Sequence, residues 1–446
     1  MGVRRLSSFF LSHKNILPSP SNYYHAQTRF LVKVRLKWVK NRTLDHVIDI
    51  ETDLKAASLL KDAIARSSHS FLSSQSLSRS HSVLGLTVPV LRFLRRYPSL
   101  FLEFPHPTYQ SLPCFRLTDT ALLLDRQERS IHLAHQSDAV ERLSKLLMMS
   151  NSRSLPLQSL IPLRWDLGLP DDFITTLIPS CLDHFHVVRR HDGVPCLSLT
   201  QWRDEFAVSA LQRASEKEDG GYRNFKKGRT LAFPMSFPRG YGSQKKVVAW
   251  MDEFQKLPYV SPYEDSSQID PNSHLMEKRV VGVLHELLSL SIHKKMKRNY
   301  LRCLREELNL PHKFTRIFTR YPGIFYLSLK CKTTTVVLKE GYRRGKLVDP
   351  HPLARTREKF YYVMRTGFIY RGKGLTGLVG EKEDMGVDGF DQMGENSQED
   401  IETDDEYYEE NASNVETGSE FDICMTGSLS SGIKFITKII WLVNIS

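Results

Sequence analysis

The sequence lacks paired cysteines and long apolar runs. Its six cysteines are scattered, and no two of them form a CxxC pair. This pattern offers neither a disulfide framework nor a zinc knuckle and is typical of a reducing compartment. No run reaches the ~18–20 apolar residues that a membrane-spanning helix needs. The apolar C-terminal segment is short and interrupted by Lys434 and Lys438. We therefore expect no integral membrane anchor.

Recognisable catalytic motifs are also missing. The chain has no GxSxG, no HExxH and no paired-carboxylate signature. Residues 372–377 match G-x-G-x-x-G, but no apolar helix follows them, as a dinucleotide site would require. Neither His132 with His135 nor His184 with His186 has a Cys or Glu companion at metal-ligand spacing. The sequence thus predicts a protein that is not an enzyme and that uses no metal or cofactor.

Charge is unevenly distributed, which predicts separate terminal segments. The first 44 residues contain nine Lys or Arg and no acidic residue. Residues 1–34, rich in Ser and Arg, have the composition of an organellar transit peptide. Arg4 and Arg5, with apolar residues behind them, favour the mitochondrion, and the chloroplast is the alternative. Residues 376–423 are predicted to be a disordered acidic tail, because 381–422 hold seventeen acidic residues and one Lys. A short apolar segment, 424–446, closes the chain.

Between these ends the chain is basic. Residues 45–380 carry 50 basic and 33 acidic residues, a surplus that favours a polyanionic partner. Short basic stretches alternate with aromatic residues, a combination suited to nucleic acid because cations neutralise phosphates and exposed rings stack on unpaired bases. In 294–308 we expect an amphipathic helix with its cations facing outwards. The candidate RNA-binding residues are Lys226, Lys227, Arg229, Lys245, Lys246, Lys294, Lys295, Lys297, Arg298, Arg343, Arg344 and Lys346.

A hexapeptide pattern occurs twice, as RYPSLF at 96–101 and RYPGIF at 320–325. Each copy ends a stretch of helical periodicity, since proline cannot continue a helix, and leads into an extended apolar run. Three helices followed by a hairpin are predicted for 137–200 and again for 277–340. The expected fold is therefore α+β and mostly helical, with repeated helix–helix–helix–hairpin units like those of a winged helix. The alternative is a helical repeat whose apolar stripes only form a core.

Several stretches resemble the plant organelle RNA recognition (PORR) domain family. In order along the chain, they are RLKWVKNRTLDHVI (35–48), LRWDLGLP (163–170), FPMSFPRGYGSQKKVVAWMDEFQKLPYVSPYED (233–265), VLHELLSL (283–290) and YPGIFYLSLKCKTTTVVLKEGYRRGKLV (321–348). We assign the PORR-like domain to residues 35–375. The resemblance implies an imported RNA-binding protein that assists the splicing of group II introns. Intron RNA would then be its partner, and other splicing factors are candidate partners. The resemblance supplies no catalytic residues and no agreed set of base contacts.

Two alternatives stay open. One is a winged-helix protein that binds double-stranded DNA of the organelle. The other is an organellar nuclease, which would need clustered carboxylates to hold metal ions. The acidic residues of the basic domain are dispersed along the sequence, which disfavours the nuclease.

Overall fold

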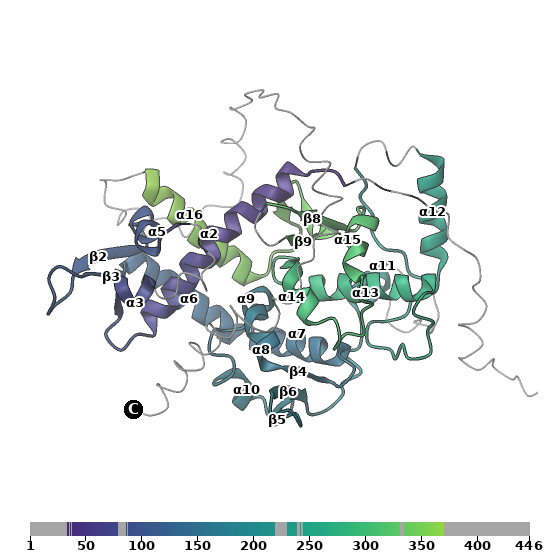
Figure 1. Ribbon diagram of the computed structural model, residues 1–446, viewed down its shortest axis with the longest axis horizontal. Coiled ribbons are helices and arrows are strands. Elements are labelled where there is room, and N and C mark those ends of the chain that lie inside the picture. Colours follow the sequence, from purple (N-terminus) through teal and green to yellow (C-terminus); the bar gives the residue numbers. More distant parts are fainter. Residues whose placement is uncertain are drawn as a thin grey trace, which may run out of the picture.

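The structure, a computed structural model, describes residues 34, 36, 38–78, 86, 88–218, 230–238, 241, 244–330 and 334–369. The predicted transit peptide, apart from its last residue, and both predicted C-terminal segments lie outside the described residues. The described chain is mostly helical and contains small antiparallel sheets (Figure 1). The predicted α+β, mostly helical fold class is therefore confirmed.

Three successive units share one order of elements: a first helix, a short strand, further helices and a hairpin. In each unit the short strand pairs with the last strand, so the sheet orders are β1–β3–β2, β4–β6–β5 and β7–β9–β8. Unit 1 contains α2 (Arg42–Ala65), β1 (Phe71–Ser73), α3 (Ser74–Ser78), α5 (Val90–Arg96), β2 (Phe101–Pro105) and β3 (Pro113–Leu117).

Unit 2 contains α7 (Gln136–Met149), β4 (Ser154–Pro156), α8 (Leu157–Leu160), η1 (Ile161–Leu163), α9 (Arg164–Leu167), α10 (Leu177–Ser180), β5 (Phe185–Arg189) and β6 (Pro195–Leu199). Unit 3 contains α13 (His274–Leu290), β7 (Lys295–Lys297), α14 (Arg298–Cys303), η3 (Phe314–Arg316), α15 (Ile317–Arg320), β8 (Phe325–Ser328) and β9 (Thr335–Leu338). The remaining elements are α6 (Asp119–Ala134), α11 (Ala210–Glu218), α12 (Lys245–Lys256), η4 (Lys339–Gly341), β10 (Tyr342–Arg343), β11 (Lys346–Leu347) and α16 (Pro352–Ile369).

The turn that opens each sheet has the same geometry in all three units. A serine hydroxyl, from Ser67, Ser150 or Ser291, donates a 2.8 Å hydrogen bond to the carbonyl three residues before it. Three residues after the serine, the backbone takes a positive φ, at Ser70 (56°), Arg153 (52°) and Lys294 (52°). The strand begins at the next residue. The same turn therefore precedes the first strand of all three sheets.

The prediction of one helix over 294–308 is wrong at both of its ends. Lys295–Lys297 form strand β7, and helix α14 covers only Arg298–Cys303. β7 pairs with β9, with Lys295 opposite Val337, although the two segments lie far apart in sequence. Helical periodicity is a local signal, and this long-range pairing overrides it.

The repeated RYP motif ends a helix in units 1 and 3. Tyr97 and Tyr321 are the C-cap residues of α5 and α15, with nearly equal dihedrals (φ −119°, ψ 64° and φ −115°, ψ 60°). In both copies the motif meets a carboxylate on the first helix of its unit. The Tyr97 hydroxyl donates to Asp53 at 2.6 Å, and Arg320 Nε lies 3.0 Å from a Glu277 oxygen. The motif therefore has a structural role.

Helix α2 connects units 1 and 3. Its C-terminal part packs in the apolar core of unit 1, and its N-terminal part lies on the sheet of unit 3 (Figure 1). There, Tyr326 and Ser328 donate hydrogen bonds of 2.8 and 2.6 Å to the buried Asp45 carboxylate. The largest apolar cluster is shared by units 2 and 3, where α7 packs against α13.

Candidate nucleic-acid interface

The β10–β11 hairpin places three predicted RNA-binding residues on the surface. Arg343, Arg344 and Lys346 are all exposed. Arg344 (φ 50°) and Gly345 (φ 78°) form the two-residue turn, and two positive φ values are what a type I′ turn requires. A tight turn of this type holds the three cations close together.

The tip of this hairpin lies against the first turn of α2. A Cβ atom built on Gly345 would come within 2.6 Å of Thr43 Cγ2, so only glycine allows this approach. Arg42, the neighbour of Thr43, is also exposed. We call Arg42, Arg343, Arg344 and Lys346 the basic corner. None of its four cations forms a close ion pair with a carboxylate of the described residues, and only Lys346 has a carboxylate, that of Glu358, near enough to interact with it. The corner therefore presents a net positive charge to an external anion.

Other predicted residues lie elsewhere. Lys245 and Lys246 are exposed on the first turn of α12, which appears at the right-hand edge of Figure 1. Lys226, Lys227 and Arg229 lie outside the described residues. The structure therefore brings Arg343, Arg344 and Lys346 together and adds Arg42, which we did not single out as a contact. Its only sequence signal is its place in the stretch 35–48.

The expectation that the cations of 294–298 face outwards is wrong for Lys295. Its side chain is only 3% exposed, and its ammonium lies 2.9 Å from a Glu51 oxygen on α2. Burial by itself raises the pKa of Glu51, but Lys295, His293 and Lys55 outweigh that effect and lower it to about 2. The strand pairing of β7 turns Lys295 inwards, onto a carboxylate that sequence periodicity could not reveal. Lys295 therefore joins unit 3 to α2 and does not offer its charge to phosphates.

The neighbours of Lys295 are half-buried. The Lys294 ammonium donates to the carbonyl of Ser289 at 2.5 Å, and burial lowers the pKa of Lys294. Lys297 and Arg298 are also half-buried. This segment is thus a weaker candidate for RNA contact than the basic corner.

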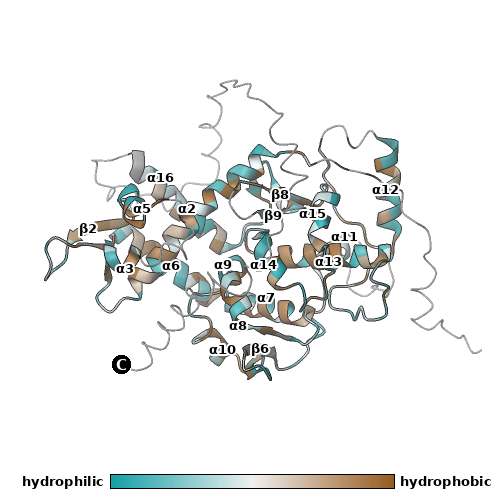
Figure 2. Ribbon diagram, viewed as in Figure 1, coloured by the Kyte–Doolittle hydropathy of each residue, from teal (hydrophilic) through white to brown (hydrophobic). Residues whose placement is uncertain are grey.

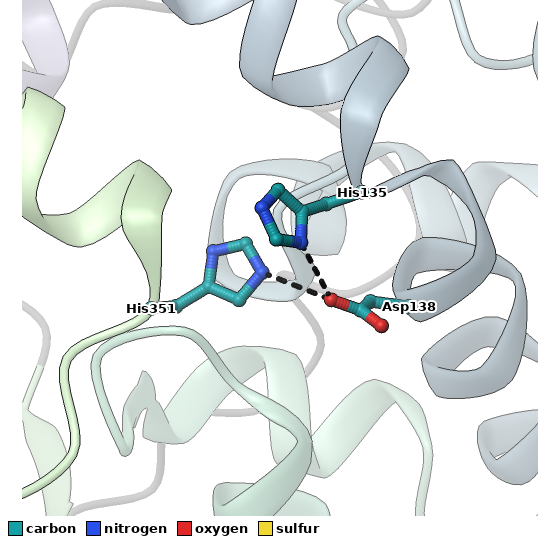
Figure 3. Close-up of side chains that lie close together, drawn as sticks. All are labelled: His135, Asp138 and His351. Atoms are coloured by element: carbon teal, nitrogen blue, oxygen red, sulfur yellow. Dashed lines mark hydrogen bonds and ion pairs between the residues drawn. The ribbon is translucent and has the colours of Figure 1, made fainter.

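A second kind of site is a cluster of His135, Asp138 and His351 (Figure 3). Asp138 Oδ2 lies 3.0 Å from His135 Nδ1 and 3.7 Å from His351 Nε2. Two imidazoles and a carboxylate are a common set of metal ligands. Sequence spacing pointed only to His132 as a companion of His135. The structure instead supplies Asp138 from α7 and His351 from the start of α16.

The protonation of His351 does not fit a metal ion. Its Nδ1 accepts the backbone N–H of Leu353 at 3.1 Å, so the proton of the neutral ring sits on Nε2, the atom that faces the cluster. Burial lowers the pKa of His351 to about 4, and the nearby Arg142 acts in the same direction. A metal at Nε2 would have to displace that proton and break the bond that caps α16. The cluster is better described as a polar link between α7 and α16.

A group of carboxylates, Asp62, Asp125 and Glu128, is the other metal-like cluster among the described residues. The Lys61 ammonium lies 2.7, 2.5 and 3.0 Å from these three side chains, respectively. Burial by itself lowers the pKa of Lys61, but the three carboxylates outweigh it and raise that pKa well above its usual value. The ammonium therefore already occupies the position that a metal ion would take.

None of the described helices is long and apolar enough to cross a bilayer.

Comparisons with known proteins agree on one family. The family model "Plant organelle RNA recognition domain" matches residues 39–368. The Arabidopsis thaliana protein WHAT'S THIS FACTOR 9, mitochondrial, is 37% identical over 341 residues, 76% of this chain and 87% of the relative. WHAT'S THIS FACTOR 1, chloroplastic, from Zea mays is 32% identical over 335 residues, 74% of this chain and 67% of the relative. ROOT PRIMORDIUM DEFECTIVE 1 from Arabidopsis thaliana is 35% identical over 280 residues, 60% of this chain and 67% of the relative.

No solved structure matches the chain. The family match covers all three units and the basic corner, since it extends from residue 39 to residue 368. This chain belongs to the plant organelle RNA recognition (PORR) domain family.

Proposed function

We propose that this protein binds organellar RNA and promotes the splicing of group II introns by stabilising folded intron RNA. The observation that supports this proposal is the basic corner, which lies inside the family match and whose exposed cations form no close ion pair with a described carboxylate. Phosphate neutralisation releases counterions, so such a surface attracts RNA strongly at low salt. In this proposal the protein supplies binding energy, and the intron RNA carries out the chemistry.

The mitochondrion is the proposed subcellular location, and the chloroplast is the alternative. The relative with 37% identity is named mitochondrial, and the Zea mays relative is named chloroplastic. The composition of residues 1–34 supports import. A fusion of residues 1–45 to a fluorescent protein should enter mitochondria. Fluorescence in plastids would favour the chloroplast as the location, and cytosolic or nuclear fluorescence would contradict import.

Neither alternative function has comparable support. A nuclease needs metal ions held by carboxylates, and the clustered carboxylates of α2 and α6 already enclose the Lys61 ammonium. A DNA-binding winged helix places a helix in the major groove of B-DNA. The segment 170–182 of unit 2, which we expected to be its third helix, is helical only at α10 (Leu177–Ser180), which is too short for that role.

The test is to sequence the RNA that co-purifies with the tagged protein from both organelles, and to measure intron splicing in plants that lack it. We expect enrichment of intron-containing transcripts and accumulation of their unspliced form. Equal recovery of duplex DNA and intron RNA at matched salt would favour the DNA-binding alternative. Normal splicing of every enriched transcript would contradict the proposed role.

A further inference from the structure

The three units present equivalent sheet faces that are used differently. Directly opposed residues of antiparallel strands share a face. In unit 3, the face with Tyr326 and Val337 is covered by the N-terminal part of α2, and both side chains are buried. The equivalent face of unit 2 is lined by the polar Ser154, His186 and Ser198. The corresponding face of unit 1 differs from both.

In unit 1 this face is apolar, aromatic and partly exposed: Phe71 and Phe104 are half-buried, and Cys114 beside them is buried. The strand register places Phe71, Leu102 and Arg116 side by side, and Phe104 lies on the same face two residues beyond Leu102. Leu102 keeps 42% of its surface exposed, and Arg116 is exposed. The opposite face of the sheet carries Phe115, which is buried in the core of the unit. Figure 1 shows the β2–β3 hairpin projecting from the left-hand side of the molecule, and Figure 2 shows β2 in the brown of hydrophobic residues.

Aromatic rings continue from this face to the tip of the hairpin. The Phe71 ring centroid lies 5.3 Å from that of Phe104 and 6.1 Å from that of His106, and His106 lies 5.4 Å from Tyr109. The Arg116 guanidinium is 5.8 Å from the Phe104 centroid. We call Phe71, Phe104, His106, Tyr109 and Arg116 the ring face. It combines flat apolar rings with one cation.

The hairpin tip holds Tyr109 in an exposed position. His106 Nδ1 accepts the backbone N–H groups of Thr108 and Tyr109 at 3.1 and 3.2 Å, which fixes the turn. The Tyr109 side chain is nevertheless 66% exposed. An ordered backbone that presents an exposed ring loses little conformational entropy when a ligand stacks on that ring.

The chemistry of the ring face matches unpaired nucleotides. Bases stack on aromatic rings and on guanidinium planes, and a guanidinium also binds phosphate. These three strands carry one carboxylate, Glu103. It lies opposite Phe115 in the strand register and therefore belongs to the other face of the sheet. Arg95 donates two hydrogen bonds to it, of 2.8 and 2.7 Å. Glu103 therefore adds no negative charge to the ring face. Bases inside a duplex are already stacked and cannot reach such a surface.

We propose that the ring face of unit 1 binds unpaired nucleotides of RNA, with bases stacked on Phe104 and Tyr109 and with Arg116 on a neighbouring base or phosphate. This site rests on the proposed RNA-binding function and makes it more specific. The basic corner, on α2 and the β10–β11 hairpin, contacts phosphates regardless of pairing. The ring face selects single-stranded segments such as loops and junctions.

The test compares two RNA probes on the full chain: a short unstructured oligouridine and a fully paired RNA duplex, both fluorescently labelled. The variants are Phe104→Thr and the double variant Tyr109→Ser with Arg116→Gln. These substitutions are chosen to leave the strand pairing of the sheet intact. The matched control is Arg189→Gln, which removes an exposed arginine from the equivalent hairpin of unit 2. Loss of one stacking ring should weaken oligouridine binding roughly tenfold. Duplex binding and the control variant should change by less than about threefold, because phosphate contacts elsewhere remain.

The outcomes separate this inference from the proposed function. If the wild type binds oligouridine and both folded variants bind it equally well, the ring face is not the site, although RNA binding stands. Equal losses for oligouridine and duplex would also overturn the selection of unpaired bases. If the wild type binds neither probe, the proposed function itself fails. Should Phe104→Thr unfold, crosslinking of wild type to 4-thiouridine RNA decides the matter. Crosslinks in 101–117 support the inference, and crosslinks found only elsewhere overturn it.

Discussion

The Lys295 ammonium lies 2.9 Å from the Glu51 carboxylate, so a residue of unit 3 holds the helix that builds unit 1. Trp165 Nε1 also donates to Glu51, at 3.2 Å, which brings unit 2 into the same contact. Lys295, which its basic neighbours in the sequence suggested as an RNA contact, therefore stabilises the packing of the three units.

Replacing Lys295 should destabilise the protein. Lys295→Met leaves the buried Glu51 carboxylate without its main cation and should lower the free energy of unfolding by roughly 3 kcal/mol. Urea unfolding followed by circular dichroism measures this change. Lys245→Met, at an exposed position, is the control and should change stability by less than about 0.5 kcal/mol. Equal stability of the two variants would show that Lys295 does not hold α2 in place.

Removing the basic corner should reduce the salt dependence of RNA binding. Arg42→Gln, Arg343→Gln, Arg344→Asn and Lys346→Gln should together flatten the slope of log K against log salt by roughly two to three units, since each lost contact to single-stranded RNA removes about 0.7. Asn is chosen for Arg344 because it tolerates a positive φ. The control variant replaces the exposed Arg126, Arg189, Lys256 and Arg365 with Gln. An unchanged slope in the folded variant, or an equal loss in the control, would remove the basic corner as the phosphate contact.

The two tyrosines of the repeated motif should respond differently to loss of their hydroxyl. Tyr97 donates to Asp53 at 2.6 Å, whereas the buried Tyr321 hydroxyl forms no hydrogen bond of good geometry with a described residue and only interacts with the nearby Glu277 carboxylate. Tyr97→Phe should therefore cost about 1–2 kcal/mol of stability, and Tyr321→Phe should be nearly neutral. Thermal or urea unfolding of both variants is the measurement. A larger loss for Tyr321→Phe would reverse this assignment.

Two half-buried histidines should make the protein less stable in acid. Burial lowers the pKa of His132 and of His351 to about 4, below the ordinary histidine value of about 6.5. Between these values the unfolded chain binds more protons, so stability should fall as the pH falls from 6.5 towards 4, by up to about 1.4 kcal/mol per pH unit for each histidine. His351→Asn should weaken this dependence at little cost near pH 7, because Asn also caps helices. Identical pH profiles for variant and wild type would contradict this role of His351.

The acidic tail should compete with RNA for the basic surface. Residues 381–422 carry seventeen acidic residues and one Lys, and charges of opposite sign attract across the ~8 Å screening length of physiological salt. Truncation after Gly380 should tighten non-specific RNA binding by about 1 kcal/mol at low to moderate salt, where such attraction is least screened. Filter-binding titrations measure the change. Unchanged or weaker binding of the truncated chain would leave the tail without this role.

Local signals in the sequence predicted much of the fold. The α+β class, the helices α7 and α13, and the hairpins β5–β6 and β8–β9 follow from periodicity and turn residues, which act over a few positions. Periodicity and turn residues did not predict the short strands β1, β4 and β7. Each has three residues and exists because it pairs with a distant hairpin strand. A segment this short has no period of its own to detect.

Of the candidate site, the sequence alone determined the charge: a basic middle region, the basic residues Arg343, Arg344 and Lys346 that follow the predicted hairpin, and the absence of recognisable catalytic motifs. Only the tertiary structure decided which cations are available. In the folded chain Lys295 contacts Glu51, and Gly345 packs against Thr43 beside Arg42. Helix α2 covers the sheet face of unit 3, whereas the equivalent face of unit 1 stays partly exposed. The physical reason is that composition depends on residue types alone, whereas burial and pairing depend on contacts between segments hundreds of residues apart.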